Sequence, residues 1–181
     1  MSRPLKAFIH PSALINNLLV ARQAAPASRI MSVVKANGYG HGLLRVARAL
    51  EESDGFAVLS VHEAVSLREA GFGQPILLLE GVFGADELTA VSEHGLSIVV
   101  HTAEQIAMLR SAWSPVRIDV FLKLNTGMNR LGFPPEEFPR AMAELQACPM
   151  VGKITLMTHF ATADEAAGIG EQFARFQALT Q

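Results

Sequence analysis

The stretch on which the fold turns reads Ile30-Met31-Ser32-Val33-Val34-Lys35-Ala36-Asn37-Gly38-Tyr39-Gly40-His41-Gly42. A mostly apolar run leads up to Lys35, as in a short buried strand. Three glycines then stand at alternate positions, and glycine lets the backbone take positive φ and approach a ligand closely. We therefore expect a strand that ends at Lys35, a tight turn, and a helix that starts near Gly42.

Similar apolar runs recur along the chain, and amphipathic stretches separate them. We predict strands at Ile30–Val34, Phe56–Ser60, Ile76–Leu79, Ser97–Val100, Ile118–Leu124 and Ile154–Met157. We predict helices at Ser12–Ala24, Leu43–Glu52, His62–Ala70, Ala85–His94, Ala103–Ala112 and Glu136–Ala147. Most residues of the runs are apolar, without polar alternation, which is typical of strands buried on both faces of a parallel sheet.

This alternation of strand and helix predicts a parallel α/β protein. A doubly wound sheet fits six strands, whereas a (β/α)8 TIM-type barrel needs eight and would be incomplete here, with about six of its eight βα units. The pattern of runs leaves both open. No linker or low-complexity stretch divides the chain, so we expect residues 1–181 to form one barrel-type domain.

Two finer expectations concern single helices. Ser12 follows a proline and is a residue type that caps helix starts, so we expect the first helix to begin at Pro11-Ser12. Ile106, Leu109 and Trp113 are spaced to share one buried helical face.

Composition excludes several classes of protein. Half of the 181 residues are hydrophobic, 18% are charged and the net charge is −2, which is typical of a globular protein. This balance gives no attraction to nucleic acid or an anionic membrane, and no apolar run nears the roughly 20 residues that span a bilayer. We expect no signal peptide. The single Cys148 fits a reducing cytoplasm, and the histidines lack metal-ligand spacing, so we predict no metal site.

The placement of Lys35 suggests cofactor chemistry. Active sites of parallel α/β folds gather where strands end, and a neutral lysine amine attacks carbonyl groups. A helix start after the glycines would suit a phosphate. Pyridoxal phosphate (PLP) needs these two features, an amine for its aldehyde and a place for its phosphate. The plain alternative is a solvated lysine before an ordinary turn; the glycine spacing fits neither a dinucleotide loop nor a P-loop.

The segment Val33–Gly42 closely resembles the PLP-attachment signature of alanine racemases, A-V-x-K-A-[DN]-[AG]-Y-G-H-G. The resemblance continues at Gly55–Val58, Arg68–Gly71 and Pro75–Gly81. It implies that Lys35 binds the PLP aldehyde covalently and is one of two bases that move the substrate α-proton. It also implies that Tyr39 hydrogen-bonds the PLP phosphate and that His41 has at most a supporting role.

A second motif reads Lys123-Leu124-Asn125-Thr126-Gly127-Met128-Asn129-Arg130-Leu131-Gly132 and resembles the racemase segment K-[LM]-[DN]-[TS]-G-M-x-R-[LIV]-G. Taken alone it would be a surface turn. The resemblance implies that Arg130 approaches the PLP phenolic oxygen and helps to hold the substrate carboxylate. Lys123 matches a lysine that is carbamylated in some members. Many members carry Asp where this chain has Asn125, so an inorganic anion is the alternative to the carbamate.

A third motif, Met157-Thr158-His159-Phe160-Ala161-Thr162-Ala163-Asp164, resembles the racemase segment M-[ST]-H-[FL]-[AS]-x-A-D. A lone histidine at a strand end is more often a core residue. The resemblance places His159 beside the PLP ring. Asp164 fits a structural role as a helix N-cap.

The resemblance implies a PLP-dependent isomerase that interconverts L-alanine and D-alanine for peptidoglycan synthesis or alanine catabolism, and that works as a cytoplasmic homodimer. In this family a tyrosine on a C-terminal β domain supplies the second base across the dimer interface, and an arginine faces the pyridine nitrogen. Both would lie after Gln181. We therefore expect an N-terminal portion, without that domain, that is inactive alone.

Three other interpretations remain. The chain could be a non-catalytic PLP-binding barrel concerned with cofactor homeostasis, but such proteins lack the G-Y-G-H-G and T-G-M-x-R segments present here. It could be a decarboxylase of the same superfamily, whose attachment strand differs after the lysine. It could also be a partner-dependent fragment without a function of its own.

Overall fold

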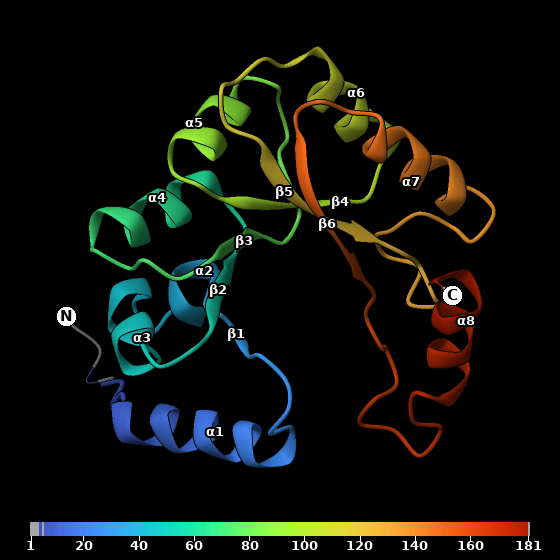
Figure 1. The fold of residues 1–181 in the computed structure, drawn as a ribbon. Coiled ribbons are helices and arrows are strands. Elements are labelled where there is room, and N and C mark those ends of the chain that lie inside the picture. Colours follow the sequence, from blue (N-terminus) through green and yellow to red (C-terminus); the bar gives the residue numbers. More distant parts are fainter. Residues whose placement is uncertain (1–3, 5, 181) are drawn as a thin grey trace. The chain divides into compact units, whose positions relative to one another are not determined.

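The computed structural model describes residues 4 and 6–180 and alternates strands with helices (Figure 1). The strands are β1 (Met31–Val33), β2 (Gly55–Val58), β3 (Ile76–Leu78), β4 (Ser97–Val100), β5 (Ile118–Lys123) and β6 (Val151–Met157). The helices are α1 (Pro11–Ala24), α2 (Lys35–Tyr39), α3 (Leu43–Ala49), α4 (Val61–Glu69), α5 (Glu87–Glu93), α6 (Ala103–Ser111), α7 (Phe138–Gln146) and α8 (Gly170–Thr180).

Strand order decides between the two candidate folds. The strands follow one another as β1-β2-β3-β4-β5-β6, and the pairs with recorded register are parallel. A doubly wound sheet reverses its order at a switch point, whereas a barrel adds each strand beside the last. The sequential order therefore confirms the predicted barrel type, with six of a barrel's eight strands among the described residues.

The chain divides into two compact units, and the first is Met1–Ile76. Within it β1 pairs with β2, from Met31 opposite Gly55 to Val33 opposite Ala57. Phe56 is fully buried and meets the ring of Phe72 edge to face at 5.3 Å between centroids. This packing buries β2 beside the strand that leads to Lys35.

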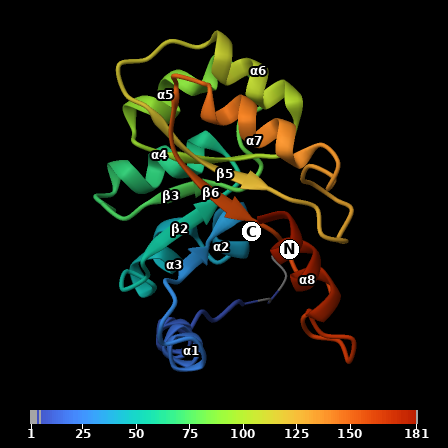
Figure 2. The ribbon, with the colours of Figure 1, turned by 45° about the vertical axis from the view of Figure 1, so that its right-hand side comes forward.

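The second unit is Leu77–Gln181. Val120 on β5 lies opposite Ile98 on β4 and Ile154 on β6, so β5 is the middle strand of the three. Helices α6 and α7 lie side by side on these strands (Figure 2). The strand β6 is buried at Val151 and only partly covered further on, whereas β4 is buried from Ile98 to Val100.

Most predicted elements are present, with ends shifted by a few residues, as is usual for strand and helix termini. The predicted strand Ile154–Met157 starts earlier, at Val151. The apolar pattern did not reveal this start, because Gly152 and Lys153 belong to the strand but are exposed. Two helices, α2 and α8, had no counterpart in the prediction. No helix in the described part of the chain has the length and apolar character needed to cross a bilayer.

Three finer predictions are corrected by the structure. The first helix begins at Pro11, within the predicted Pro11-Ser12 start, but its N-cap is His10 and not Ser12, because proline suits the first helical turn. Trp113 does not join the buried face of α6: the helix ends at Ser111, the chain becomes extended at Ala112, and the indole is 87% exposed. Asp164 lies in a turn and does not cap α8.

Candidate active site

Lys35 stands where the sequence predicts, directly after the first strand. The backbone N–H of Val34 donates to Ala57 O at 2.9 Å, which extends the pairing of β1 with β2 by one residue. Val34 is fully buried and Lys35 is half-buried. In the part of the chain that the structure describes, the Lys35 amine has no hydrogen-bond or ion-pair partner. The amine thus lies at the carboxyl end of a strand, and no described group forms a hydrogen bond or an ion pair with it.

The segment after Lys35 is a left-handed turn. The φ angles are 52° at Ala36, 55° at Asn37, 61° at Gly38 and 54° at Tyr39. For most residues this conformation costs roughly 1–2 kcal/mol of stability each. Glycine adopts it without this cost, and asparagine tolerates it better than other residues. The sequence predicts a turn here, but not that alanine and tyrosine share the left-handed region with the glycine.

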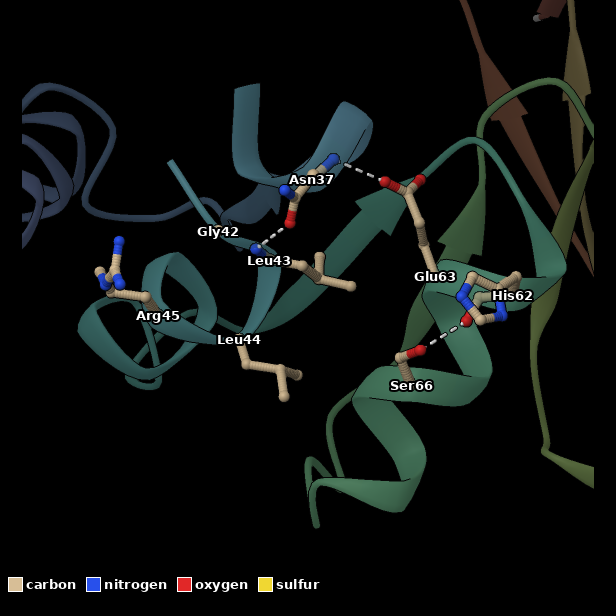
Figure 3. Close-up of a pocket in the computed structure, with 8 residues that line it drawn as sticks. All are labelled: Asn37, Gly42, Leu43, Leu44, Arg45, His62, Glu63 and Ser66. Carbon is tan, nitrogen blue, oxygen red and sulfur yellow. Dashed lines mark hydrogen bonds between the residues drawn. The ribbon is translucent and has the colours of Figure 1, made fainter. Parts of the chain in front are cut away.

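Contacts with α3 hold this turn in place. A Cβ atom added to Gly38 would lie 2.8 Å from Val46 Cγ2, so only glycine allows the turn to approach the helix so closely. The Asn37 side chain accepts a hydrogen bond from Leu43 N at 2.8 Å (Figure 3). The predicted helix start near Gly42 is confirmed, since α3 begins at Leu43. Asn37 already occupies the Leu43 N–H there, so this group is not open to a phosphate.

A further contact comes from α4. Glu63 Oε1 accepts a hydrogen bond from Asn37 N at 2.8 Å (Figure 3). The only local signal for Glu63 in the sequence is Ser60-Val61-His62-Glu63, which has the spacing of a helix capping box and does not point to Asn37. Figure 3 also shows residues of α3 and α4 that line a pocket of about 570 Å³, and Asn37 and Glu63 are among its lining residues. Neither Lys35 nor Tyr39 lines this pocket.

Tyr39 ends the turn with its ring 59% exposed. Among the described residues its hydroxyl has no hydrogen-bond partner. Lys35 precedes the left-handed residues and Tyr39 is the last of α2, so the two side chains stand at opposite ends of the turn. His41 Nδ1 lies 3.0 Å from Gly38 O, within hydrogen-bond distance, so His41 supports the turn.

In the second unit Lys123 is the last residue of β5, and only 6% of it is exposed. Burial lowers the pKa of its amine below the ordinary value, and the positive charge of Arg130 lowers it further, while Glu80 opposes both effects. A neutral amine is more nucleophilic than an ammonium group. The site therefore favours the reactive form of Lys123.

The loop after Lys123 is closed by its own side chains. Asn125 Oδ1 accepts hydrogen bonds from Gly127 N at 3.0 Å and Asn129 N at 3.1 Å. Gly132 returns the chain so closely that a Cβ atom would lie 2.9 Å from Asn125 N. Asn125 thus shapes the loop that carries Arg130. The guanidinium of Arg130 is exposed and has no hydrogen-bond or ion-pair partner among the described residues.

His159 follows β6 and shares its surroundings with these two cations. Partial desolvation lowers the pKa of the imidazole first, and the charges of Lys123 and Arg130 lower it further. The ring is therefore neutral at pH 7. Within the second unit the charges of Lys123 and Arg130 thus act on the imidazole of His159, and the charge of Arg130 acts on the amine of Lys123.

The helix α8 adds residues that sequence reasoning missed. Arg175 Nη1 donates to Thr126 O at 3.0 Å, and Thr126 Oγ1 lies 2.7 Å from Thr158 Oγ1. These bonds tie the Arg130 loop to α8 and to the residue before His159. Neither these bonds nor the helix α8 itself was predicted from the sequence.

The side chains present fit PLP by their chemistry. The first unit offers an unpaired, half-buried amine for an aldehyde and a free hydroxyl donor for a phosphate. The second offers an unpaired guanidinium beside a neutral imidazole. Within the described residues no three His, Cys, Asp or Glu side chains gather as metal ligands would.

Comparison with known sequences names the family. The profile of the family described as "Alanine racemase, N-terminal domain" matches residues 9–181. The alanine racemase of Nitrosospira multiformis is 58% identical over 165 residues, which cover 91% of this chain and 46% of that protein. The alanine racemase of Nitrosomonas europaea is 52% identical over 184 aligned positions, covering 100% of this chain and 51% of that protein.

Comparison with solved structures agrees. The biosynthetic alanine racemase of Pseudomonas aeruginosa superposes with a TM-score of 0.88 at 38% identity, over 93% of this chain and 48% of that one. A histidine racemase from Leuconostoc mesenteroides subsp. sake superposes with a TM-score of 0.80 at 29% identity, over 94% and 48%. The chain spans about half the length of the curated relatives that it matches. Because the family profile covers nearly the whole chain, this protein belongs to the alanine racemase family, a family of PLP-dependent isomerases, and corresponds to its N-terminal domain.

Proposed function

We propose that the chain is the PLP-binding barrel portion of an enzyme that interconverts L-alanine and D-alanine. The observation that carries the proposal is the 58% identity to an alanine racemase, joined to the position of Lys35 at the carboxyl end of β1. The proposal concerns the whole protein of which this chain is the matching half. It leaves open whether the D-alanine is made for peptidoglycan or the enzyme serves alanine catabolism.

The first unit would hold the cofactor and move a proton. PLP, when bound, supplies an electron sink that stabilises negative charge on the substrate Cα. Lys35 would hold its aldehyde and then transfer a proton at the substrate Cα on one face. Tyr39 would donate its free hydroxyl to the phosphate. The exposed ring and the unpaired amine support both roles.

The second unit would orient the substrate. The guanidinium of Arg130 offers paired donors to a carboxylate or a phenolate oxygen. Lys123 would carry a carbamate, or an inorganic anion would lie beside it, and either negative charge would hold Arg130 in position. Its burial and lowered pKa support carbamylation, because carbon dioxide reacts with the neutral amine. His159, neutral at pH 7, would lie beside the pyridine ring.

Several properties belong to the whole protein. We propose a cytoplasmic homodimer in which a C-terminal β domain supplies the second base as a tyrosine across the interface. The chain has one tyrosine, Tyr39, and the proposal already assigns it to the phosphate. Racemisation needs a proton donor or acceptor on each face of Cα, and the proposal assigns the second face to that tyrosine of the C-terminal β domain.

Borohydride trapping tests the first part of the proposal. The full-length protein is incubated with PLP, reduced, digested and analysed by mass spectrometry. The pyridoxyl adduct is expected on Lys35 and is expected to vanish in Lys35→Ala. An adduct on another lysine, or none, would refute the assignment.

Product chirality tests the second part. Full-length protein supplied with L-alanine should yield D-alanine, while Lys35→Ala should lose turnover by at least about a thousandfold, as expected for loss of a covalent catalytic group. L-histidine is the comparison substrate, since one structural relative is a histidine racemase. Faster turnover of histidine than of alanine would overturn the proposed substrate but not the reaction.

A further inference from the structure

The carboxylate of Glu63 joins three backbone segments of the first unit. Its Oε1 accepts a hydrogen bond from Asn37 N in the left-handed turn at 2.8 Å. Its Oε2 accepts from Leu59 N, just after β2, at 3.3 Å. Glu63 itself stands in the first turn of α4. Figure 3 shows its side chain reaching from α4 toward Asn37.

This use of the carboxylate differs from ordinary helix capping. In a capping box the glutamate three residues into the motif bonds back to the N–H of the cap residue itself. The serine part of the capping box is formed here, since Ser60 Oγ accepts a hydrogen bond from Glu63 N at 3.2 Å. The Glu63 carboxylate, however, bonds Leu59 N and crosses to Asn37, 26 residues away in the chain. Glu63 therefore does more than cap its own helix.

The turn needs such an acceptor. The first N–H groups of any helical turn, of either hand, have no carbonyl partner within the turn. Asn37 N is one of these groups, whereas Gly38 N already bonds to Val34 O at 2.9 Å. A hydrogen bond to a carboxylate is stronger than one to water or to a neutral oxygen. Glu63 thus stabilises a backbone conformation that Ala36 and Tyr39 would otherwise disfavour.

We propose that Glu63 is a positioning residue that sets the directions of Lys35 and Tyr39 by fixing the left-handed turn between them. The inference rests on the proposed function, because it assigns a task to the cofactor-holding side chains. Glu63 touches neither cofactor nor substrate. Its loss leaves the Asn37–Leu43 hydrogen bond intact, so the turn keeps one anchor and the variant is expected to fold.

Three variants of the full-length protein separate positioning from simple stability. Glu63→Gln keeps the shape of the side chain but replaces one acceptor oxygen with an amide donor, so it satisfies only one of the two N–H groups. Ser60→Ala removes the cap of α4 and leaves Asn37 untouched. Glu69→Gln makes the same chemical change on an exposed residue at the end of the same helix.

Hydrogen exchange of the apoprotein gives a readout that does not depend on activity. Glu63→Gln is expected to speed exchange in a peptide that covers residues 35–42 by about tenfold, the factor expected when one charge-assisted hydrogen bond is lost. Ser60→Ala is expected to speed exchange in α4 instead, and Glu69→Gln to change neither. Equal exchange of residues 35–42 in Glu63→Gln and wild type would overturn the proposal.

The loaded enzyme gives the functional readout. Glu63→Gln is expected to lower kcat for alanine about tenfold, to change the absorbance spectrum of the lysine-bound cofactor, and to change KM less than twofold. If Ser60→Ala reproduces these effects, Glu63 serves only α4 and the proposal fails. If wild type forms no adduct at Lys35, the proposed function fails instead, and the exchange result on the apoprotein still decides the role of Glu63 in the turn.

Discussion

Gly38 shows how tightly the turn after Lys35 packs against α3. Its φ is +61°, and an added Cβ atom would lie 2.8 Å from Val46 Cγ2. Gly38→Ala is therefore expected to destabilise the full-length apoprotein by about 2–4 kcal/mol, because overpacking adds to left-handed strain. Thermal unfolding followed by circular dichroism measures the loss.

Gly71→Ala is the matched control for that variant. Gly71 also has positive φ, at +92°, but apart from its chain neighbours no atom of the described residues lies within 4 Å of the added Cβ. Only the backbone strain remains, so the expected loss is about 1–2 kcal/mol. If the two variants lose equal stability, the close approach of Gly38 to Val46 does not matter.

Lys123 makes a prediction about pH. Its pKa in the folded state is lowered, first by burial and then by Arg130. Between that lowered pKa and the ordinary lysine value of about 10.4, the unfolded chain binds more protons than the folded one, so stability rises with pH. Below the folded pKa both states are protonated and the full cost of burying the charge is present.

The variant Lys123→Met removes this dependence while keeping the length of the side chain. In CO2-free buffer the wild-type apoprotein should gain melting temperature as pH rises toward the ordinary lysine value, and Lys123→Met should gain less. Lys153→Met is the control, because Lys153 is exposed on β6. Parallel curves for wild type and Lys123→Met would show that the buried amine is not the cause.

Among the elements, α8 supports the loop that carries Arg130. Arg175 Nη1 donates to Thr126 O at 3.0 Å, and Thr126 is buried. Arg175→Met keeps the apolar stem but loses this bond. In the full-length protein it is expected to raise KM for alanine about fivefold, because the loop no longer holds Arg130 firmly, while stability falls by only about 1 kcal/mol. Steady-state kinetics and thermal unfolding measure the two effects.

Glu171→Gln tests whether the hydrogen bond from Arg175 to Thr126, and not the surface ion pair of Arg175, positions the loop. Arg175 also pairs with Glu171 at 3.3 Å, but both side chains are exposed and such pairs contribute little. Glu171→Gln should therefore leave KM within about twofold of wild type. If it raises KM as much as Arg175→Met does, the bond to Thr126 is not what positions the loop.

For the whole molecule the prediction concerns the 181-residue chain by itself. It carries the amine proposed for one face of the substrate but no second tyrosine for the other. We expect little or no D-alanine from L-alanine in an assay coupled to D-amino-acid oxidase, with the full-length protein as the positive control. Robust turnover by the 181-residue chain would contradict the assignment of the second base to residues outside it.

Much of the fold could be predicted from local patterns. The apolar run that ends at Val100 is a strand whose residues Ile98, Val99 and Val100 are buried, and burial of successive residues leaves an unbroken apolar pattern. The run before Lys35 is also a strand, but it is only partly covered, with Val33 41% exposed. Trp113 was misplaced because periodicity does not say where a helix ends. The helix α8 was missed, and of its residues only Gln172 is buried, so it packs through few side chains.

The sequence by itself determined the alternation of strand and helix, the family, and the three motifs that contain Lys35, Arg130 and His159. Only the tertiary structure decided the left hand of the turn, the bond from Glu63 to Asn37, the buried state of Lys123, and the clamp from Arg175 to Thr126. The reason is physical. Apolar periodicity is written into neighbouring residues, whereas these features arise from contacts between segments 26 and 49 residues apart, or from burial by the packed sheet.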